Sequence, residues 1–163
     1  MKSSRTTKII IGVACILLIL SLTIFKQRQG SVSVKDIEDL TNLWIREVTE
    51  RNNPEAISKL FCADGNLVGT VSQVKRNGAD IKKYFDYFAK LPGIRVVAKE
   101  YNISKITDNV YLNTAFIRWQ WEGLSEPITA RMTFIFRNKC IFQLHSSALP
   151  DLNKDLYKIS NSR

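Results

Sequence analysis

The stretch Ile128–Pro150, "ITARMTFIFRNKCIFQLHSSALP", decides the fold class. β-Branched and aromatic residues dominate its two apolar runs, Ile128–Arg137 and Cys140–Ser147, and such residues are enriched in strands. The tight turn "RNK" between the runs predicts a β-hairpin. The second run closes in the chain's only histidine, two serines and a proline. Polar side chains are therefore concentrated at the end of an otherwise apolar strand.

Two further runs of this composition precede the hairpin, at Ile94–Ile103 and Val110–Trp121. The polar segments "TDN" and "EGLSEP" separate these runs from each other and from the hairpin, as expected for turns between strands. A shorter apolar run at Leu67–Val71 predicts one more strand. We therefore expect long antiparallel strands in the second half of the chain.

Three segments before these strands carry apolar residues at helical spacing. The first begins at the capping pair Ser33 and Asp36, and the second has Pro54 at its first helical position. The third lies between "NG" at 77–78 and "PG" at 92–93, which favour turns. The positions expected to be buried are Ile37, Leu40, Leu43, Trp44 and Val48, then Ala56, Ile57, Leu60 and Phe61, then Ile81, Tyr84, Phe85, Phe88 and Leu91.

Three helices followed by long antiparallel strands predict an α+β domain in which helices cover one face of a curved sheet. Three motifs carry a resemblance to a known family: an opening with Trp44, "PEA", "LF" and "DG", the segment "GADIKKYFDYF", and the ending quoted above. They resemble the nuclear transport factor 2-like superfamily, and within it the association (hub) domain of calcium/calmodulin-dependent kinase II and its small bacterial SnoaL-like relatives. The resemblance covers residues 36–150 and implies a cone-shaped fold with a pocket, three N-terminal helices on a curved antiparallel sheet, and oligomerisation through that sheet. One departure is Cys140, which follows the tight turn where many relatives carry tryptophan.

Arg118 and Arg131 interrupt otherwise apolar strands. A buried cation is unfavourable unless it is solvated, paired or given an anionic ligand. The resemblance implies that Arg118 lines the pocket, because the matching arginine of the hub domain contacts small carboxylates, and that Arg131 lies on the next strand. We expect both to bind a small anionic molecule through its carboxylate or phosphate. The alternative is that both face outward and pair with acidic residues, namely Glu100, Glu122 or Glu126.

His145 and Tyr84 are the other candidate ligand-binding residues. Histidine can act as a general base near neutral pH, but catalysis also needs an orienting acid or a nucleophile, which the sequence does not place beside His145. His145 is therefore only a weak catalytic candidate, and we expect it to hydrogen-bond at the strand end and pocket mouth. Period-2 alternation places it on one strand face with Ile141, Gln143 and Ser147. Tyr84 fits both a pocket wall and the buried stripe of its helix.

The N-terminal segment Ile9–Phe25 contains seventeen residues without a charge. As a helix it would be about 26 Å long, which is close to the roughly 30 Å of a bilayer's hydrocarbon core. The basic residues Lys2, Arg5 and Lys8 precede it, and no small-x-small cleavage pattern follows it. We expect a single-pass anchor, with a cleaved signal peptide and a buried soluble helix as the alternatives.

The positive-inside rule favours a cytoplasmic N-terminus and a periplasmic domain at a bacterial inner membrane, or secretion if the segment is cleaved. The chain is thus divided into a basic tail (1–8), the anchor or signal (9–25), a linker (26–35), the α+β domain (36–150) and a C-terminal tail (151–163).

Charge and cysteine content exclude several functions. Five of the 24 Lys/Arg and none of the 15 Asp/Glu fall in residues 1–30, which leaves a net charge of +4 for residues 31–163. No aromatic-rich basic motif is present, so Lys75–Arg76 is interpreted as solvated surface and no nucleic acid is expected. Cys62 and Cys140 lack metal-ligand or CxxC spacing, so no metal or cofactor is expected. Two buried free thiols are favoured over a disulfide.

The predicted function is a membrane-anchored small-ligand-binding or assembly module with a pocket for a small anion. One alternative is a cofactor-free isomerase, dehydratase or hydrolase, although Tyr84, Tyr87, Asp64 and Asp86 form no recognisable catalytic dyad. A further alternative is a scaffold component of a membrane machine. A homodimer or larger homo-oligomer is expected because one small cone should not bury all four strand aromatics, Trp119, Trp121, Phe134 and Phe136.

Overall fold

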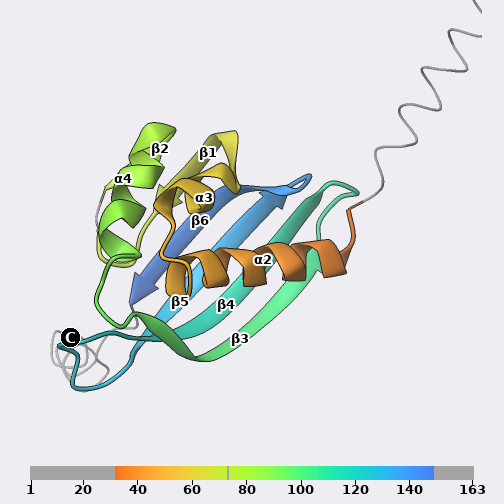
Figure 1. Ribbon diagram of the computed structural model, residues 1–163. Coiled ribbons are helices and arrows are strands. Elements are labelled where there is room, and N and C mark those ends of the chain that lie inside the picture. The colour runs from red at the N-terminus through yellow and green to blue at the C-terminus, as the bar shows by residue number, and fades with distance from the viewer. Residues whose placement is uncertain (1–31, 73, 149–163) are drawn as a thin grey trace, which may run out of the picture. The chain divides into compact units, whose positions relative to one another are not determined.

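The structure, a computed structural model, describes residues 32–72 and 74–148, in which helices cover one face of a curved six-stranded sheet (Figure 1). The helices are α2 (Val34–Thr49), α3 (Pro54–Lys59) and α4 (Ala79–Phe88). The strands are β1 (Phe61–Val68), β2 (Lys75–Asn77), β3 (Arg95–Lys105), β4 (Val110–Gln120), β5 (Ile128–Arg137) and β6 (Cys140–Ala148). Their order across the sheet is β2-β1-β6-β5-β4-β3. The predicted α+β arrangement is confirmed.

The sequence analysis predicted an antiparallel sheet. This is wrong for one pair of strands, because β1 runs parallel to β6. A parallel pair needs a long connection, and here the connection contains α4 and the β3–β5 meander. Phe61 opens β1 instead of closing the second helix, because it pairs with Ile141 of β6. The last four strands match their predicted bounds within two residues.

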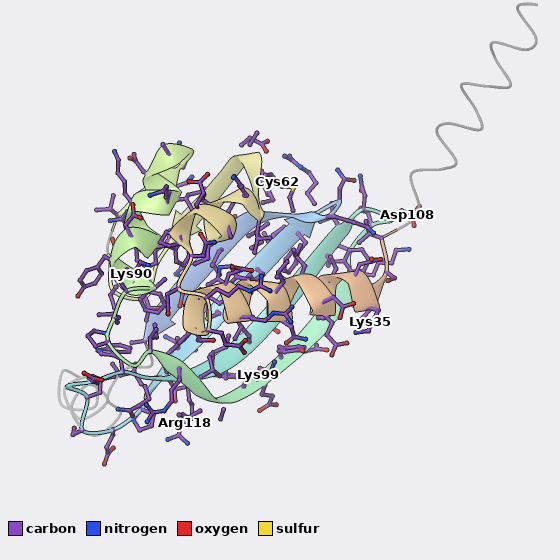
Figure 2. All side chains as sticks on the ribbon, viewed as in Figure 1. Lys35, Cys62, Lys90, Lys99, Asp108 and Arg118 are labelled. Atoms are coloured by element: carbon purple, nitrogen blue, oxygen red, sulfur yellow. A yellow bond between two sulfur atoms is a disulfide. The ribbon has the colours of Figure 1, made fainter. Side chains whose placement is uncertain are left out.

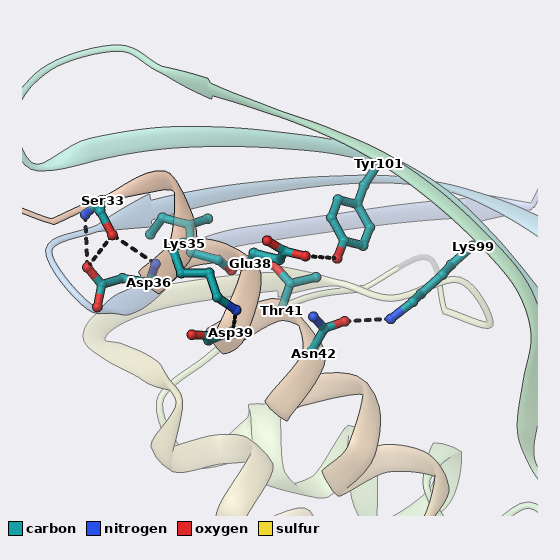
Figure 3. Close-up of polar contacts among 10 residues, drawn as sticks. Ser33, Lys35, Asp36, Glu38, Asp39, Thr41, Asn42, Lys99 and Tyr101 are labelled. Carbon is teal, nitrogen blue, oxygen red and sulfur yellow. Dashed lines mark hydrogen bonds and ion pairs between the residues drawn. The ribbon is translucent and has the colours of Figure 1, made fainter.

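Local sequence signals start the helices as predicted. In α2 the Ser33 hydroxyl accepts from the Asp36 N–H at 3.1 Å, while the Asp36 carboxylate accepts from the Ser33 N–H at 2.9 Å. Figure 3 shows this capping box and the contacts that tie α2 to β3. There, Tyr101 donates to Glu38 at 3.4 Å and Lys99 donates to Asn42.

The core is aromatic and centres on Trp44 of α2. Its ring makes edge contacts with Phe85 at 6.1 Å, Trp119 at 6.0 Å and Phe134 at 5.3 Å between ring centroids. Trp119, Phe134 and Phe136 are buried, and Trp121 packs against the same cluster. The prediction that one cone cannot bury these aromatics is therefore wrong, because the curved sheet brings them onto a single inner face.

A β-bulge changes the faces predicted for β6. Ile141 pairs with Phe136 and Gln143 pairs with Ile135, so Phe142 is an extra residue in β6. Ile141 therefore lies on the inner face with Leu144 and Ser146, whereas His145 is exposed on the outer face. The strict alternation that grouped Ile141 with His145 was wrong for this reason.

Cys62 and Cys140 form a disulfide with a Cα–Cα distance of 5.1 Å, so the expectation of free thiols was wrong. The sequence could not reveal the pairing, since 78 residues separate the two cysteines and only the parallel β1–β6 pairing brings them together. An ion pair between Arg137 and Asp64 lies beside the disulfide. Disulfides that close loops of this size typically stabilise a fold by about 2–4 kcal/mol.

The described residues contain no helix that is both long and apolar enough to cross a membrane. The predicted span Ile9–Phe25, the linker up to residue 31 and the C-terminal tail lie outside the described residues.

The outer face of the sheet carries one large exposed aromatic side chain, Phe116, with half of its surface accessible (50%). Phe116 lies opposite Glu100 on β3 and Arg131 on β5. The helices lie on the opposite face (Figure 1). An apolar side chain flanked by opposite charges suits contact with a second copy, because each cation could meet the other copy's carboxylate. Self-association stays a prediction on this basis.

Replacing Phe116 with aspartate should abolish self-association, since two such faces would then bury like charges. We expect residues 31–163 to sediment as a dimer or larger species at micromolar concentration and the Phe116→Asp variant to sediment as a monomer. Tyr87→Asp is the matched control, because Tyr87 is an even more exposed aromatic residue but lies on α4. A monomeric wild type, or a dimeric Phe116→Asp variant, would contradict this.

Candidate functional site

The centre of the cone, beside Trp44, is almost completely filled by side chains, whereas an open groove of about 450 Å³ lies at the edge of the sheet between α2 and β3. Trp44, Tyr84 and Phe88 from the helices and Trp119, Met132 and Leu144 from the strands surround an internal cavity of about 10 Å³. That is at most the room for one water molecule. The centre of the cone therefore contains no preformed cavity for a ligand.

Tyr84 closes the mouth of the cone at its polar end. Its ring packs so closely on Gly69 that a Cβ atom there would overlap the ring. Beside it, the hydroxyls of Thr70 and Ser146 share a hydrogen bond between the end of β1 and β6. Tyr84 is the one predicted ligand-binding residue that the structure brings to this mouth.

Burial raises the pKa of Tyr84 to about 12, although interactions with Val71, Arg76 and Thr70 oppose the shift. The desolvation of the charged phenolate is the physical cause. Tyr84 therefore remains a neutral hydroxyl at physiological pH and can donate a hydrogen bond.

Arg76 of β2 lies over the outer side of Tyr84, with its Cζ atom 5.3 Å from the ring centroid. Its Nη1 donates to Ser72 Oγ at 2.6 Å and to the Val74 carbonyl at 2.9 Å. Among the described residues no carboxylate lies within 4 Å of this half-buried guanidinium. Arg76 is thus a cation held by neutral oxygen atoms and an aromatic face.

Two buried indole groups in the cone lack hydrogen-bond acceptors. Trp44 and Trp119 are each 1% exposed, and neither Nε1 has a partner within the part of the chain that the structure describes. Both residues line the cavity. A buried donor without an acceptor is destabilising. These two indole N–H groups could therefore donate to an acceptor atom of a ligand.

The strand residues predicted to bind an anion do not face this cone. Arg118 and Arg131 are exposed and alternate with Trp119 and Met132, which line the cavity. His145 is also exposed. The prediction that Arg118 and Arg131 converge on the cavity, with His145 at its mouth, is wrong, because period-2 alternation turns all three side chains to the outer face, which for the two arginines was the alternative. Figure 2 shows Arg118 at the periphery of the domain.

Sequence reasoning missed Arg76, Thr70 and Ser146 at the mouth. Lys75–Arg76 was interpreted as solvated surface, yet Arg76 is half-buried. The available signal was "GTVS" at 69–72, where a glycine and two hydroxyl residues directly follow an apolar strand. Only the tertiary structure places that segment against Tyr84.

Comparison with known proteins supports the fold assignment. A protein of Xanthomonas campestris assigned as a calcium/calmodulin-dependent protein kinase II association domain superposes with a TM-score of 0.63 at 23% identity, covering 74% of this chain and 90% of the other. The fold is nuclear transport factor 2-like.

Two other solved structures share this nuclear transport factor 2-like fold. A cystatin-like domain of unknown function from Nostoc punctiforme has a TM-score of 0.63 at 15% identity, covering 79% of this chain and 86% of its own. A protein of Novosphingobium aromaticivorans assigned as a scytalone dehydratase has a TM-score of 0.54 at 11% identity, with coverage of 71% and 83%. No family model and no curated protein matches the sequence. The nuclear transport factor 2-like fold thus hosts both enzymes and association domains.

Replacing Gly69 with alanine should destabilise the domain by forcing Tyr84 out of the mouth. Overpacking of a filled site costs about 1–3 kcal/mol, so urea denaturation should show a free energy of unfolding lower by that amount. In a Tyr84→Leu background, Gly69→Ala should cost much less, so the double variant should be nearly as stable as Tyr84→Leu alone. Equal losses in both backgrounds would mean that the Gly69–Tyr84 contact does not control the mouth.

Proposed function

We propose that the protein is a small-molecule-binding module whose ligand enters the cone beside Tyr84. The observation that carries this proposal is the pair of buried indole N–H groups of Trp44 and Trp119 that face no acceptor in the described structure. A ligand with an acceptor atom would satisfy one of these donors, and its apolar part would replace Tyr84 against the aromatic walls. The fold supports the proposal, since its known members include a dehydratase-type protein.

Binding requires Tyr84 to move, since the cavity of about 10 Å³ admits no organic molecule. The contacts that hold Tyr84 in place include a cation–π contact with Arg76, packing on Gly69 and ring contacts with Phe85 and Phe88. A cation–π contact contributes about 0.5–2 kcal/mol. Displacing the buried Tyr84 ring also loses its contacts with Phe85 and Phe88, and a ligand that buries its apolar surface in the same place, at about 25 cal/mol per Å², would replace these contacts. A movable tyrosine is thus energetically compatible with a closed resting state.

Binding is favoured over catalysis by the composition of the cone wall. Of the described residues that line the cavity, Tyr84 is the one titratable side chain, and its pKa of about 12 keeps it protonated. General acid–base catalysis works best with groups that titrate near the operating pH. An isomerase, dehydratase or hydrolase would therefore need a second group brought in by the ligand or by another chain.

We also propose that the domain is exported and held at the membrane by Ile9–Phe25. The disulfide between Cys62 and Cys140 supports export, because disulfides persist in oxidising compartments and are rare in the cytosol. The net charge of +9, concentrated near the N-terminus, is consistent with this topology. The exposed Phe116 favours a second, assembly role for the outer face of the sheet.

Enlarging the mouth should increase affinity for a small neutral aromatic probe. Tyr84→Ala removes the phenol from the cone, so we expect benzamide to bind this variant about ten-fold or more tightly than wild type, because less of the binding free energy goes into displacing a side chain. Quenching of tryptophan fluorescence measures it, since Trp44 and Trp119 line the cone. Tyr87→Ala on the exposed side of α4 is the control. Absence of binding to wild type and to Tyr84→Ala would refute the ligand-binding function.

Export should be visible in intact cells. In a Cys15→Ala background, Cys62 and Cys140 should resist alkylation until a reductant is added, and a reporter that is active only in the periplasm should be active when fused after Arg163. Immunoblotting should place the chain, at its full mass of 18.7 kDa plus the reporter, in the membrane fraction. Free thiols with an inactive reporter would contradict export, and a chain shortened by the first thirty or so residues would contradict anchoring.

A further inference from the structure

We propose that the ligand of the cone is a small organic acid whose acidic group binds Arg76 at the mouth while its apolar body takes the place of the Tyr84 ring in the cone. This inference rests on the proposed binding function and adds to it the chemical class of the ligand. The proposed anion-binding residue is thus Arg76, which the sequence analysis had placed on the solvated surface, in place of Arg118 and Arg131.

The first argument is the unused hydrogen-bonding capacity of Arg76. A guanidinium carries five N–H donors, and here Nη1 alone accounts for the bonds to Ser72 and Val74. The remaining donors of this half-buried group have no acceptor recorded in residues 32–72 and 74–148. A planar fork of this kind matches the two oxygen atoms of a carboxylate.

The second argument is the ring of hydroxyl groups around the mouth. Ser72 already accepts from Arg76, and Thr70 and Ser146 pair with each other beside Tyr84. A hydroxyl can turn its proton toward an incoming oxygen atom, and Tyr84 is a neutral donor. Ser72 and Tyr84 contact Arg76 directly, so an acid bound there would lie beside two further hydroxyl groups.

The third argument is the charge of the neighbouring helix. On α4, Lys83 binds Asp80 at 2.8 Å and Lys82 binds Asp86 at 2.8 Å, so these charges compensate one another. Lys83, and to a lesser extent Arg76, lowers the pKa of Asp80, which keeps that carboxylate ionised and bound to lysine. Within the described part of the chain, Arg76 is thus the cation that contacts Tyr84 without forming an ion pair.

A purely structural role for Arg76, as a clamp that holds Tyr84 down, makes a different prediction. A clamp would affect neutral and acidic ligands alike, because its loss would open the mouth to both. An anion site would discriminate between ligands of the same shape that differ only in charge. Benzoate and benzamide form such a pair, and acetate and inorganic phosphate represent the acidic group without the apolar body.

The experiment is a calorimetric titration of the full chain in detergent with these four probes. We expect wild type to bind benzoate about ten-fold more tightly than benzamide and to bind acetate and phosphate only weakly. Arg76→Gln should weaken benzoate binding by about ten- to a hundred-fold and leave benzamide binding unchanged or slightly improved. Arg76→Lys keeps the positive charge but lacks the planar guanidinium, so its affinity for benzoate should lie between those of wild type and Arg76→Gln. Arg118→Gln is the matched control on the outer face and should behave as wild type.

The outcomes separate the two levels of the proposal. If benzamide binds as tightly as benzoate, or if Arg76→Gln changes both affinities equally, the acid site is refuted while ligand binding stands. If no probe binds wild type or Tyr84→Ala, the binding function itself fails. A thermal melt of each variant excludes unfolding, and titrations in the Tyr84→Ala background test Arg76 with the mouth already open. If Arg118→Gln loses affinity for benzoate and Arg76→Gln does not, the anion binds at the outer face of the sheet and the proposal is wrong.

Discussion

The packing of Trp44 against the inner face of the curved sheet is the contact on which the domain depends. Trp44 lies on α2 and touches Phe85 of α4, Trp119 of β4 and Phe134 of β5, so one side chain joins two helices to two central strands. Large aromatic side chains bury much apolar surface and favour edge-to-face contacts. This packing fixes the distance between helices and sheet. It also leaves the cone with almost no free volume, and any ligand must compete with the core for the same space.

The disulfide and the mouth of the cone illustrate how β1 is held at its two ends. Cys62, near the start of β1, is bonded to Cys140 of β6, whereas Thr70, just beyond its end, is hydrogen-bonded to Ser146 of the same strand. The first link is covalent, and the second exchanges readily with other hydrogen-bonding groups. The displacement of Tyr84 that we propose would therefore take place at the end of β1 that is not covalently linked to β6.

Local patterns in the sequence were sufficient for most of the fold but not for the site. The capping pair Ser33 and Asp36 and the β-branched runs specify their elements through short-range physics, and the structure follows them. The bulge at Phe142 depends on how β6 fits against β5 and β1, which no single-strand pattern contains. The exposure of Arg118 follows from its alternation with buried Trp119. Applying the two-residue periodicity of a strand to this pair would have placed Arg118 on the outer face. Arg76 could not be found in this way, because its partner Tyr84 is brought to it only by tertiary packing.

The closed mouth also determines how selective such a site would be. The observed affinity of a ligand falls by the fraction of molecules in which Tyr84 is displaced, so weak apolar contacts alone would give poor binding. An acid that pairs with Arg76 would gain a charge-assisted bond and would also weaken the cation–π contact that keeps Tyr84 in place. The same group would thus attract the ligand and favour opening. Neutral molecules of equal size would gain only the apolar contacts, and for this reason a nearly filled cone can discriminate among ligands without holding a preformed pocket.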